Sequence, residues 1–490
     1  MGLNGRVPIY TSVEDLDAKT VLSEVNGALA IHFNNVKDEK YLYNYRRGIQ
    51  PILHRTKERN GEICCNKVVE NHAEQVVAFK NGYFLTQKLS YVARNEESAE
   101  KVKTLNEYLY RSGKHSADND VVDWFHTVGL AYVFVEPTDD NEKPYVAYSL
   151  EPMTACVVKS LGAGNKPVYG MHVVSQGENI YVDVYTRSRY FRLWGTVDPI
   201  HPKDKPDEFV YVTKVLEERP NMLAPYVPII EYKYNKTLMS SFEPSIALFD
   251  AINDIDSNAL DGVAQFIQSL LVATNVEFDE DVTAGSIRNS GMVCLKSVGD
   301  NKADIKILAE QLDQTQTEVL KHSILKQAFD IVGVPMSQEG GSSDNVGASI
   351  FKYGYETAES YARNTEDEFR KSNELFDEIV LKILRDKNLL DLNTSDFDIA
   401  FIRNELANIQ AKAQACGTMV GFGLHPILAM EWSGLTNDPL SAYEMSKEYF
   451  DKKQNYTVES GENYGVQSGT QYGTNQEPTE TEVVEDEITI

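Results

Sequence analysis

The sequence EPSIALFDAINDIDSNALDGVAQFIQSL (residues 243–270) decides the fold more than any other stretch of the chain. Its apolar residues recur at steps of three and four, which is the spacing of one face of an α-helix. They are Ile246, Phe249, Ile252, Ile255, Ala259, Val263, Phe266 and Leu270. Pro244 suits the first helical turn, where a missing backbone N–H costs nothing. The sequence therefore predicts a long amphipathic helix from about Glu243 to Leu270.

The opposite side of this helix is polar and partly acidic. Asp250, Asp254, Asn258 and Asp261 also follow one another at steps of three and four. Residues at these steps are neighbours on a helix surface, so the four side chains form a ribbon along the helix. We expect the apolar face to pack against other elements and the ribbon to meet water.

A second helix returns beside the first. The segment from about Leu312 to Val332 keeps helical spacing and ends at Gly333 and Pro335, which are strong stop signals. Between the two helices, residues 291–308 alternate apolar and β-branched side chains, which predicts two short strands. The two helices then form a hairpin that projects from a body, with the strands at its far end.

A glycine-rich loop follows the hairpin, and a third helix follows the loop. The loop consists of Gly340, Gly341, Ser342, Ser343, Asp344, Asn345, Val346 and Gly347. Such small polar residues cannot bury a core, so we expect the loop to be mobile. Helical spacing then continues from Ala348 to Arg385, which predicts a helix of about 38 residues and roughly 57 Å. A helix of this length suits an assembly better than a small enzyme.

The rest of the chain divides into helices, strands and a polar tail. Helical patterns continue from the N-terminal region to about Arg111. Residues 131–233 alternate Tyr, Val and Phe with turn residues between them, which predicts an antiparallel β region. Residues 456–490 are rich in Gly, Ser, Thr, Gln and Glu and contain no Lys or Arg, so this segment should be disordered.

Composition limits the possible classes of protein. The 490 residues predict two to four domains or one elongated subunit with several parts. The chain has no run of about eighteen apolar residues and no basic-then-apolar start, so we expect neither membrane insertion nor export. Five cysteines lack metal-ligand spacing, which predicts free thiols. They are Cys64, Cys65, Cys156, Cys294 and Cys416.

The formal net charge of −27 bears on partners. A protein that grips nucleic acid neutralises phosphates with stripes of Lys and Arg, which gives a strong salt dependence. A strongly acidic chain argues against that mode of binding. Simple solubility of an acidic cytosolic protein also explains the charge.

Patterns typical of catalysis are weak. Residues 162–166 (GAGNK) lack the spacer and the hydroxyl residue of a phosphate loop, which favours a β-turn. Asp256 projects away from Asp250 and Asp254 on a helix and no histidine joins them, which disfavours a carboxylate metal site. The sequence therefore predicts no enzyme, no catalytic residue, no metal ion and no cofactor.

Isolated histidines and large aromatic residues have structural interpretations. The histidines lack the spacing of metal ligands or of a catalytic triad, so we expect them to be structural. They are His72, His126, His322 and His425. The large aromatic residues are expected to anchor cores. They are Trp124, Phe125, Trp194 and Trp432.

The order of helix, small β module, helix, glycine-rich loop and long helix resembles the core of the portal proteins of tailed bacteriophages, in particular the portal family typical of phages of Gram-positive bacteria. The best local match is 325–355, where an apolar helix ends at Gly-x-Pro and a Ser/Gly-rich loop leads into a small-residue helix start. Segments 41–55, 66–82, 120–135 and 404–449 resemble further family segments. In segment 66–82 the apolar residues from Val68 onward describe one helical face.

The loop departs from the family pattern in one place. Relatives often have Ser-Gly, two further residues, an apolar residue and then Lys. Here Val346 precedes Gly347, and Phe351 comes directly before Lys352. Lys352 is the basic residue that the resemblance places nearest to DNA.

The resemblance implies an α+β, elongated, ring-forming subunit. Its parts in chain order would be an N-terminal arm (1–37), a wing of helices and then antiparallel β structure (38–240), a first stem helix (241–270), a small α/β clip (271–311), a second stem helix (312–333), a tunnel loop (334–347), a long helix with the rest of the wing (348–403), a helical crown (404–455) and a disordered acidic tail (456–490).

The resemblance also implies roles for particular residues. The tunnel loop that meets DNA would comprise Gly340, Gly341, Ser342, Ser343, Asp344, Asn345, Gly347 and Lys352. The channel-facing stem would carry Asp250, Asp254, Asn258 and Asp261. The clip residues that contact the terminase or an adaptor would be Val293, Leu295, Lys296, Lys302 and Lys306. An acidic channel wall repels phosphates, so DNA of any sequence could slide past it.

The implied function is a dodecameric ring at one capsid vertex. Double-stranded DNA would be packaged through it by the terminase motor and later ejected, and the tail or head-completion proteins would attach to it. The implied partners are other copies of the chain, DNA without sequence specificity, the major capsid protein, a scaffolding protein, the large terminase subunit and a head-tail adaptor, with no membrane. The protein would be assembled in the host cytoplasm and reside in the virion.

Two alternatives come from other classes of protein. One is an acidic cytosolic metal-dependent hydrolase whose site is assembled from residues distant in sequence. The other is a ring or scaffold protein of a non-viral assembly. A hydrolase predicts a compact monomer or dimer. A portal and a non-viral ring both predict a large assembly without enzymatic turnover.

Overall fold

The computed structural model describes residues 3–56, 58–59, 62–63, 65–85, 88–177, 179–197, 210–267, 270–274, 276–277, 296–297, 304–308, 314–336, 345–401, 409–433, 435–436, 439, 442–444 and 446–447. The chain divides into two units, Met1–Leu406 and Ala407–Ile490. Each unit is described by itself.

The described residues mix helices and strands, as the sequence predicts. The helices are α1 (Val21–Arg46), α2 (His72–Phe84), α3 (Ala99–Arg111), α4 (Lys114–Val128), α5 (Ile246–Ile267), α7 (Gln314–Val332), α8 (Asn345–Asp386), α9 (Ile409–Gly421) and α10 (Pro426–Ser433). Short 3-10 helices are η1 (Pro51–His54), η2 (Glu96–Ser98), η3 (Pro152–Thr154), η4 (Glu243–Ser245) and η5 (Thr394–Asp396). Helix α1 is continuous across residues 37 and 38, where the sequence places the border between arm and wing.

The strands form several sheets. They are β1 (Ile9–Thr11), β2 (Glu58–Arg59), β3 (Glu62–Ile63), β4 (Ser90–Ala93), β5 (Leu130–Pro137), β6 (Tyr145–Leu150), β7 (Ala155–Ser160), β8 (Pro167–Gln176), β9 (Asn179–Thr186), β10 (Arg189–Val197), β11 (Val210–Pro220), β12 (Ile229–Lys233), β13 (Leu270–Thr274), β14 (Val276–Glu277), β15 (Lys296–Ser297), β16 (Asp304–Leu308) and β17 (Phe397–Ala400). The strands between residues 130 and 233 confirm the predicted antiparallel β region.

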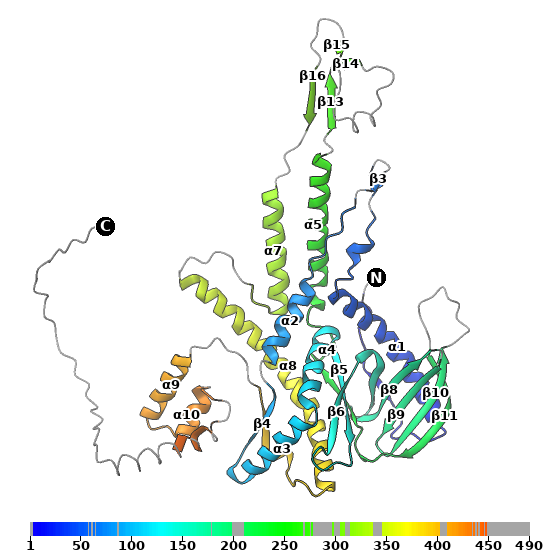
Figure 1. Ribbon diagram of the computed structural model, residues 1–490, viewed down its shortest axis with the longest axis vertical. Coiled ribbons are helices and arrows are strands. Elements are labelled where there is room, and N and C mark those ends of the chain that lie inside the picture. The colour runs from blue at the N-terminus through cyan, green and yellow to red at the C-terminus, as the bar shows by residue number, and fades with distance from the viewer. Residues whose placement is uncertain are drawn as a thin grey trace, which may run out of the picture. The chain divides into compact units, whose positions relative to one another are not determined.

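The largest sheet has the strand order β1-β7-β8-β9-β10-β11, and α1 covers one of its faces (Figure 1). Among the described strands of this sheet, β1 and β7 pair in parallel and the other neighbours pair antiparallel. Alternate residues of β9 (Ile180, Val182 and Val184) are buried in the core that this helix shares with the sheet, as period-two alternation requires. The predicted turn at residues 162–166 joins β7 to β8, where the backbone N–H of Asn165 donates to the carbonyl of Gly162 at 3.1 Å.

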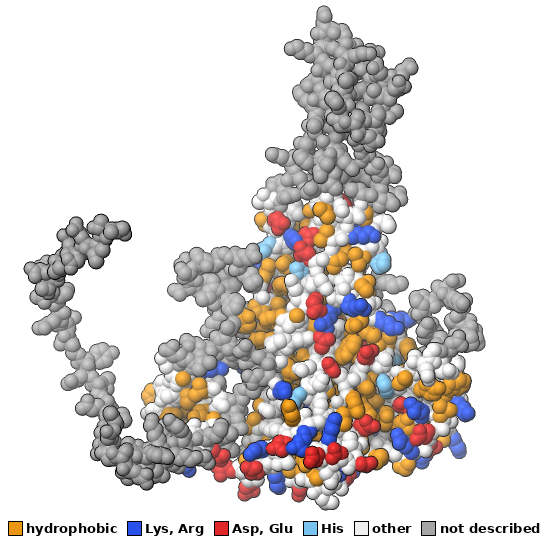
Figure 2. Space-filling model, in the orientation of Figure 1, with side chains coloured by type: hydrophobic (Ala, Val, Ile, Leu, Met, Phe, Trp, Pro, Cys, Tyr) orange, Lys and Arg blue, Asp and Glu red, His pale blue; other side chains and the backbone are white. Residues whose placement is uncertain are grey.

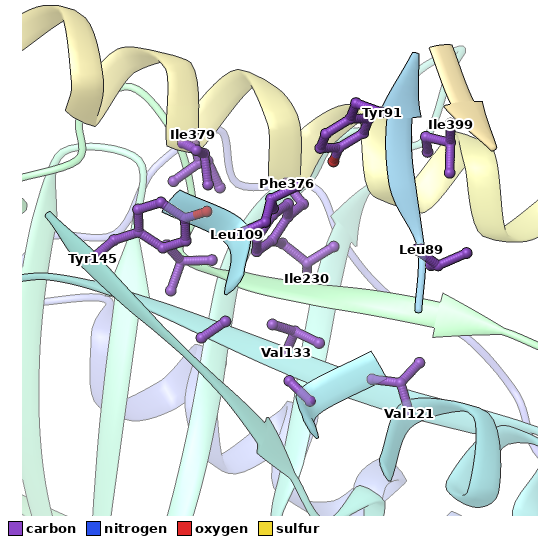
Figure 3. Close-up of a cluster of buried hydrophobic side chains, with 14 of the residues drawn as sticks. Leu89, Tyr91, Leu109, Val121, Val133, Tyr145, Ile230, Phe376, Ile379 and Ile399 are labelled. Atoms are coloured by element: carbon purple, nitrogen blue, oxygen red, sulfur yellow. The ribbon is translucent and has the colours of Figure 1, made fainter. Parts of the chain in front are cut away.

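Helix α8 closes a second core over the three-stranded sheet β12-β5-β6. Figure 3 shows Phe376 and Ile379 of α8 above Val133 of β5 and Ile230 of β12. The long helix predicted from Ala348 is therefore confirmed, and its apolar stripe packs on the sheet. It begins at Asn345, three residues earlier than predicted.

Helices α5 and α7 lie side by side and form the predicted hairpin (Figure 1). Strands β15 and β16 confirm the two strands predicted within residues 291–308. Strand β16 pairs with β13, and β15 pairs with β14. The prediction that the first helix continues to Leu270 is wrong, because Leu270 begins β13 and pairs with Leu308. Pairing between distant strands outweighs the local helical spacing at this position.

The second unit contains the predicted helix, glycine turn and short helix. Helices α9 and α10 are joined by a turn in which Gly423 has a φ of +92°. Trp432 on α10 is 66 % exposed, so its prediction as a core anchor is wrong. Phe125 of the first unit is fully buried and confirms the same prediction. Asn437 and Asp438 lie outside the described residues.

Two further sequence expectations can be compared with the described residues. Cys65, Cys156 and Cys416 are free thiols, as predicted, while Cys64 and Cys294 lie outside the described part. None of the helices described is both long and apolar enough to cross a membrane.

Candidate functional site: the root of the helical hairpin

An extended segment, residues 65–71, runs along α5 and is named the strap below. Every second backbone N–H of the strap donates to a side chain on α5. The donors are Asn66, Val68 and Glu70, and the acceptors are the side chains of Asp261, Ser257 and Asn253, at 2.8, 3.0 and 2.8 Å. Two residues of extended chain span roughly 6.6 Å and four residues of helix span about 6 Å, so the two repeats nearly match.

The strap corrects one predicted helix boundary. The apolar spacing from Val68 onward predicts a helical face, but helix α2 begins at His72. The backbone N–H groups that would start an earlier helix are bonded to α5 instead. Tertiary hydrogen bonds thus replace the helical ones in this segment.

The predicted polar ribbon of α5 is engaged by the chain itself. Tyr45 donates its hydroxyl to Asp250 at 2.8 Å, and the Arg55 guanidinium contacts both Asp254 and Asn258. The expectation that the ribbon meets water is wrong for Asp261, which is 1 % exposed beneath the strap. It holds for Asp254, whose side chain is 59 % exposed. The channel-facing role of these residues concerns an assembled ring and stays a prediction.

The start of α5 is fixed by a reciprocal cap. In the turn that leads into η4, the backbone N–H of Ser240 donates to Glu243 at 2.9 Å, and the backbone N–H of Glu243 donates to the Ser240 hydroxyl at 3.2 Å, which is the reciprocal pattern of a capping box. Arg6 pairs with the same Glu243 and donates to the carbonyl of Leu238 at 2.8 Å. Gly129 has a φ of +88°, and a Cβ there would lie 2.2 Å from this carbonyl oxygen. The hairpin therefore has a rigid root.

A half-buried ion cluster joins the strap to both helices of the hairpin. Lys321 of α7 pairs with Glu70 of the strap and with Asp256 of α5, the latter at 2.9 Å. Burial raises the pKa of Asp256. His72 contacts Glu70 at 2.8 Å and packs against Phe249, which confirms its structural role. Asp256 does point away from Asp250 and Asp254, as the helical spacing predicts.

The predicted tunnel-loop residues are only partly described. Gly340, Gly341, Ser342, Ser343 and Asp344 lie outside the described residues. Asn345 and Gly347 belong to the first turn of α8 and not to the loop, which corrects the predicted loop end. Lys352 lies on α8 two turns from its start. Because α8 packs along the second core, its first turn is the extension of an anchored helix.

The predicted clip residues are also divided. Lys296 lies in β15 and Lys306 in β16, while Val293, Leu295 and Lys302 lie outside the described residues.

The part of the chain that is described contains no group of three or more His, Cys, Asp or Glu able to hold a metal ion. On the face shown in Figure 2, Lys and Arg lie beside Asp and Glu, without a continuous basic stripe among the coloured side chains.

Several residues of the root are missing from the sequence predictions. Arg6, Arg55, Asn253 and Ser257 hold the hairpin to the body, yet the sequence pattern singles out none of them. The four-residue spacing of Asn253, Ser257 and Asp261 is the one local signal, because three small polar residues follow one line of the helix. Their partners lie more than 180 residues away and leave no local trace.

A cap, a strap and an ion cluster thus fix a long helical hairpin to its body. A family model described as "Phage portal protein, SPP1 Gp6-like" matches residues 28–457, which is most of the chain. The chain therefore belongs to this family of phage portal proteins, and the predicted resemblance is confirmed. No curated protein matches the chain. The family is generally structural and non-enzymatic, and membership implies an oligomeric ring associated with the viral capsid.

Proposed function

We propose that the protein forms a dodecameric ring at one capsid vertex, through which the terminase motor packages double-stranded DNA and through which the DNA is later ejected. Head-completion or tail proteins attach to the same ring. The family match over residues 28–457 carries this proposal. The rooted α5–α7 hairpin supports it, because a stem that transmits load between a motor and a capsid needs fixed attachment to its body.

The parts of the chain take the roles of the family. Helices α5 and α7 form the stem, strands β13–β16 belong to the clip that meets the terminase or adaptor, and residues 334–347 with Lys352 approach the DNA. Lys296 and Lys306 are the clip residues on described strands. The β region with α8 forms the wing toward the capsid and scaffold proteins, and residues 404–455 form the crown.

Charge supports passage of DNA without capture. Each copy carries a formal charge of −27, so a ring concentrates negative potential around its axis. The channel wall then repels the phosphates, so the DNA is not held tightly at any one position along its length. Asp254 and Asn258 are the ribbon residues of α5 that remain exposed in the single chain and can face such a channel.

Native mass and negative-stain images of the purified protein test the proposal. A hollow ring with a mass near twelve times 55.1 kDa is expected. If the protein is a monomer, the measurement is repeated with the scaffolding and capsid proteins present, because such partners can nucleate ring closure. A chain that stays monomeric with those partners contradicts the proposal. A hydrolytic activity lost on changing one carboxylate would favour the enzyme alternative.

A further inference from the structure

Helix α7 ends at Val332, and Gly333 follows it beneath an aromatic ring of α8. Gly333 has a φ of +67°, and a Cβ at this position would lie 2.4 Å from a ring carbon of Tyr361. The Tyr361 hydroxyl donates to the carbonyl of Ile331 at 3.2 Å. The ring thus closes the end of α7. We name the contact between Gly333 and Tyr361 the elbow.

A lysine of α2 lies directly beneath the elbow. Lys80 is 8 % exposed, and its Nζ donates to the hydroxyl of Tyr234 at 2.8 Å. The same Nζ lies 5.2 Å from the ring centroid of Tyr361 and 5.4 Å from that of Tyr234. No carboxylate among the described residues forms an ion pair with Lys80. A small cavity of about 20 Å³ adjoins it and is also lined by Gly333 and Tyr361.

The residues that line the cavity beside Lys80 include no Asp or Glu. Tyr83 comes from α2, His126 from α4, and Tyr234 from the segment after β12. Burial and then the charge of Lys80 lower the pKa of His126 well below its ordinary value, so this ring is uncharged. Glu359 of α8 accepts from the Tyr83 hydroxyl at 3.0 Å and does not pair with Lys80. The ammonium group therefore lacks a compensating anion.

A buried cation in this setting favours opening. The two rings attract the ammonium group but replace only part of its hydration. Burial lowers the pKa of Lys80 to about 7. A solvated lysine has a pKa of about 10.4, so the open elbow binds a proton more readily than the closed one. Stability of the closed elbow consequently rises with pH from about 7 to about 10 and is constant outside this range.

We propose that the uncompensated positive charge of Lys80 weakens the elbow. The contact of Tyr361 with Gly333 is then reversible, so the end of α7 and α8 can separate while the cores stay folded. This inference concerns the single chain and does not rest on the ring or on DNA passage. Lys80 contributes as a positioning residue, acting through Tyr361.

Hydrogen exchange of the intact protein, corrected for intrinsic rates, tests the inference. Peptides covering 325–336 and 355–366 report the elbow, and peptides from β9 and β10 report the core. In the wild-type protein the opening equilibrium of the elbow is expected to fall by up to about tenfold per pH unit between pH 7 and pH 10. The Lys80→Met variant should exchange more slowly at pH 7 and lose this pH dependence.

Two controls separate charge from packing. Lys80→Arg keeps the positive charge at every pH. Hydrogen exchange at its elbow should therefore stay fast and show no pH dependence. Lys236→Met removes one exposed charge and should leave the elbow unchanged. A flat wild-type profile overturns the inference, as does faster elbow exchange in folded Lys80→Met. If Lys80→Met fails to fold, the wild-type pH series decides alone.

Discussion

Arg6 and Glu243 form a buried ion pair although 237 positions separate them in the chain, and their side chains are 1 % and 8 % exposed. The pair connects the segment before β1 to the cap of α5. Residue 6 lies before the range that the family model matches, whereas residue 243 lies inside it. The hairpin of this portal protein is therefore held partly by residues outside the shared region.

Replacing Arg6 with methionine should destabilise the fold. The change leaves the buried Glu243 carboxylate without its cation, and breaking one side of a buried pair costs roughly 3–5 kcal/mol. Urea unfolding followed by circular dichroism measures this loss. The double variant Arg6→Met with Glu243→Gln should lose less, because glutamine retains an oxygen for the cap with Ser240. Equal losses in the single and double variants would contradict a role for the ion pair.

Replacing Ser257 with alanine should release the middle of the strap. The backbone N–H of Val68 then loses its acceptor in a partly buried place, which costs at most about 1–3 kcal/mol. Hydrogen exchange of the amides of residues 66–70 should accelerate accordingly. Asn258→Ala is the matched control, because Asn258 lies next to Ser257 but is exposed and binds Arg55 instead. Unchanged exchange at Val68 in Ser257→Ala would disprove the hydrogen bond between the strap and Ser257.

The sequence predicts the hairpin well because its helices follow from local spacing. Ile252 and Phe249 repeat along one face, and Gly333 ends α7 in the left-handed conformation that glycine allows. The strap is mispredicted because its hydrogen-bond partners belong to a helix nearly 190 residues further on. The roles of Arg6 and Lys80 are not predicted from the sequence for the same reason. A charged residue gives no sign in the sequence of whether a distant segment will bury it.

Asp377 of α8 should make the stability of the wing core depend on pH. It accepts hydrogen bonds from Tyr91 and from Asn373, and burial raises its pKa to about 7. The folded state then holds a proton that the unfolded chain releases near pH 4, so this group's contribution falls as pH rises from about 4 to about 7. The unfolding free energy of the wild type should fall relative to that of Asp377→Asn by up to about 1.4 kcal/mol per pH unit in that range.

A pH series of paired urea titrations measures this difference, and the comparison cancels other titrating groups. Asp386→Asn on the same helix is the control, since its side chain is 58 % exposed and pairs with Lys382 at the surface. If the difference in unfolding free energy between wild type and Asp377→Asn stays constant from pH 4 to pH 8, Asp377 remains charged in the core.

Replacing Gly333 with alanine should open the elbow without unfolding the cores. The added methyl group meets the Tyr361 ring, and the left-handed backbone at this position disfavours any residue with a Cβ. Exchange of peptide 325–336 should rise while the core peptides stay protected. Adding Tyr361→Ala to Gly333→Ala removes the clash, but not the backbone strain, and should recover part of the loss. Full protection in Gly333→Ala would mean that the ring is not seated on α7.

Replacing Lys352 with glutamate should impair DNA packaging while ring assembly stays intact. Lys352 lies near the start of α8, on the helix that the proposed tunnel loop enters, so charge reversal there would repel the phosphates that the loop meets. Packaged DNA per particle is measured after complementation of a phage that lacks its own copy, and rings are counted by negative stain. Lys371→Glu is the control, because Lys371 lies on the same helix with a 62 % exposed side chain beside Glu368. A normal DNA yield from Lys352→Glu would remove Lys352 from the DNA path, and loss of rings in that variant would assign it to assembly instead.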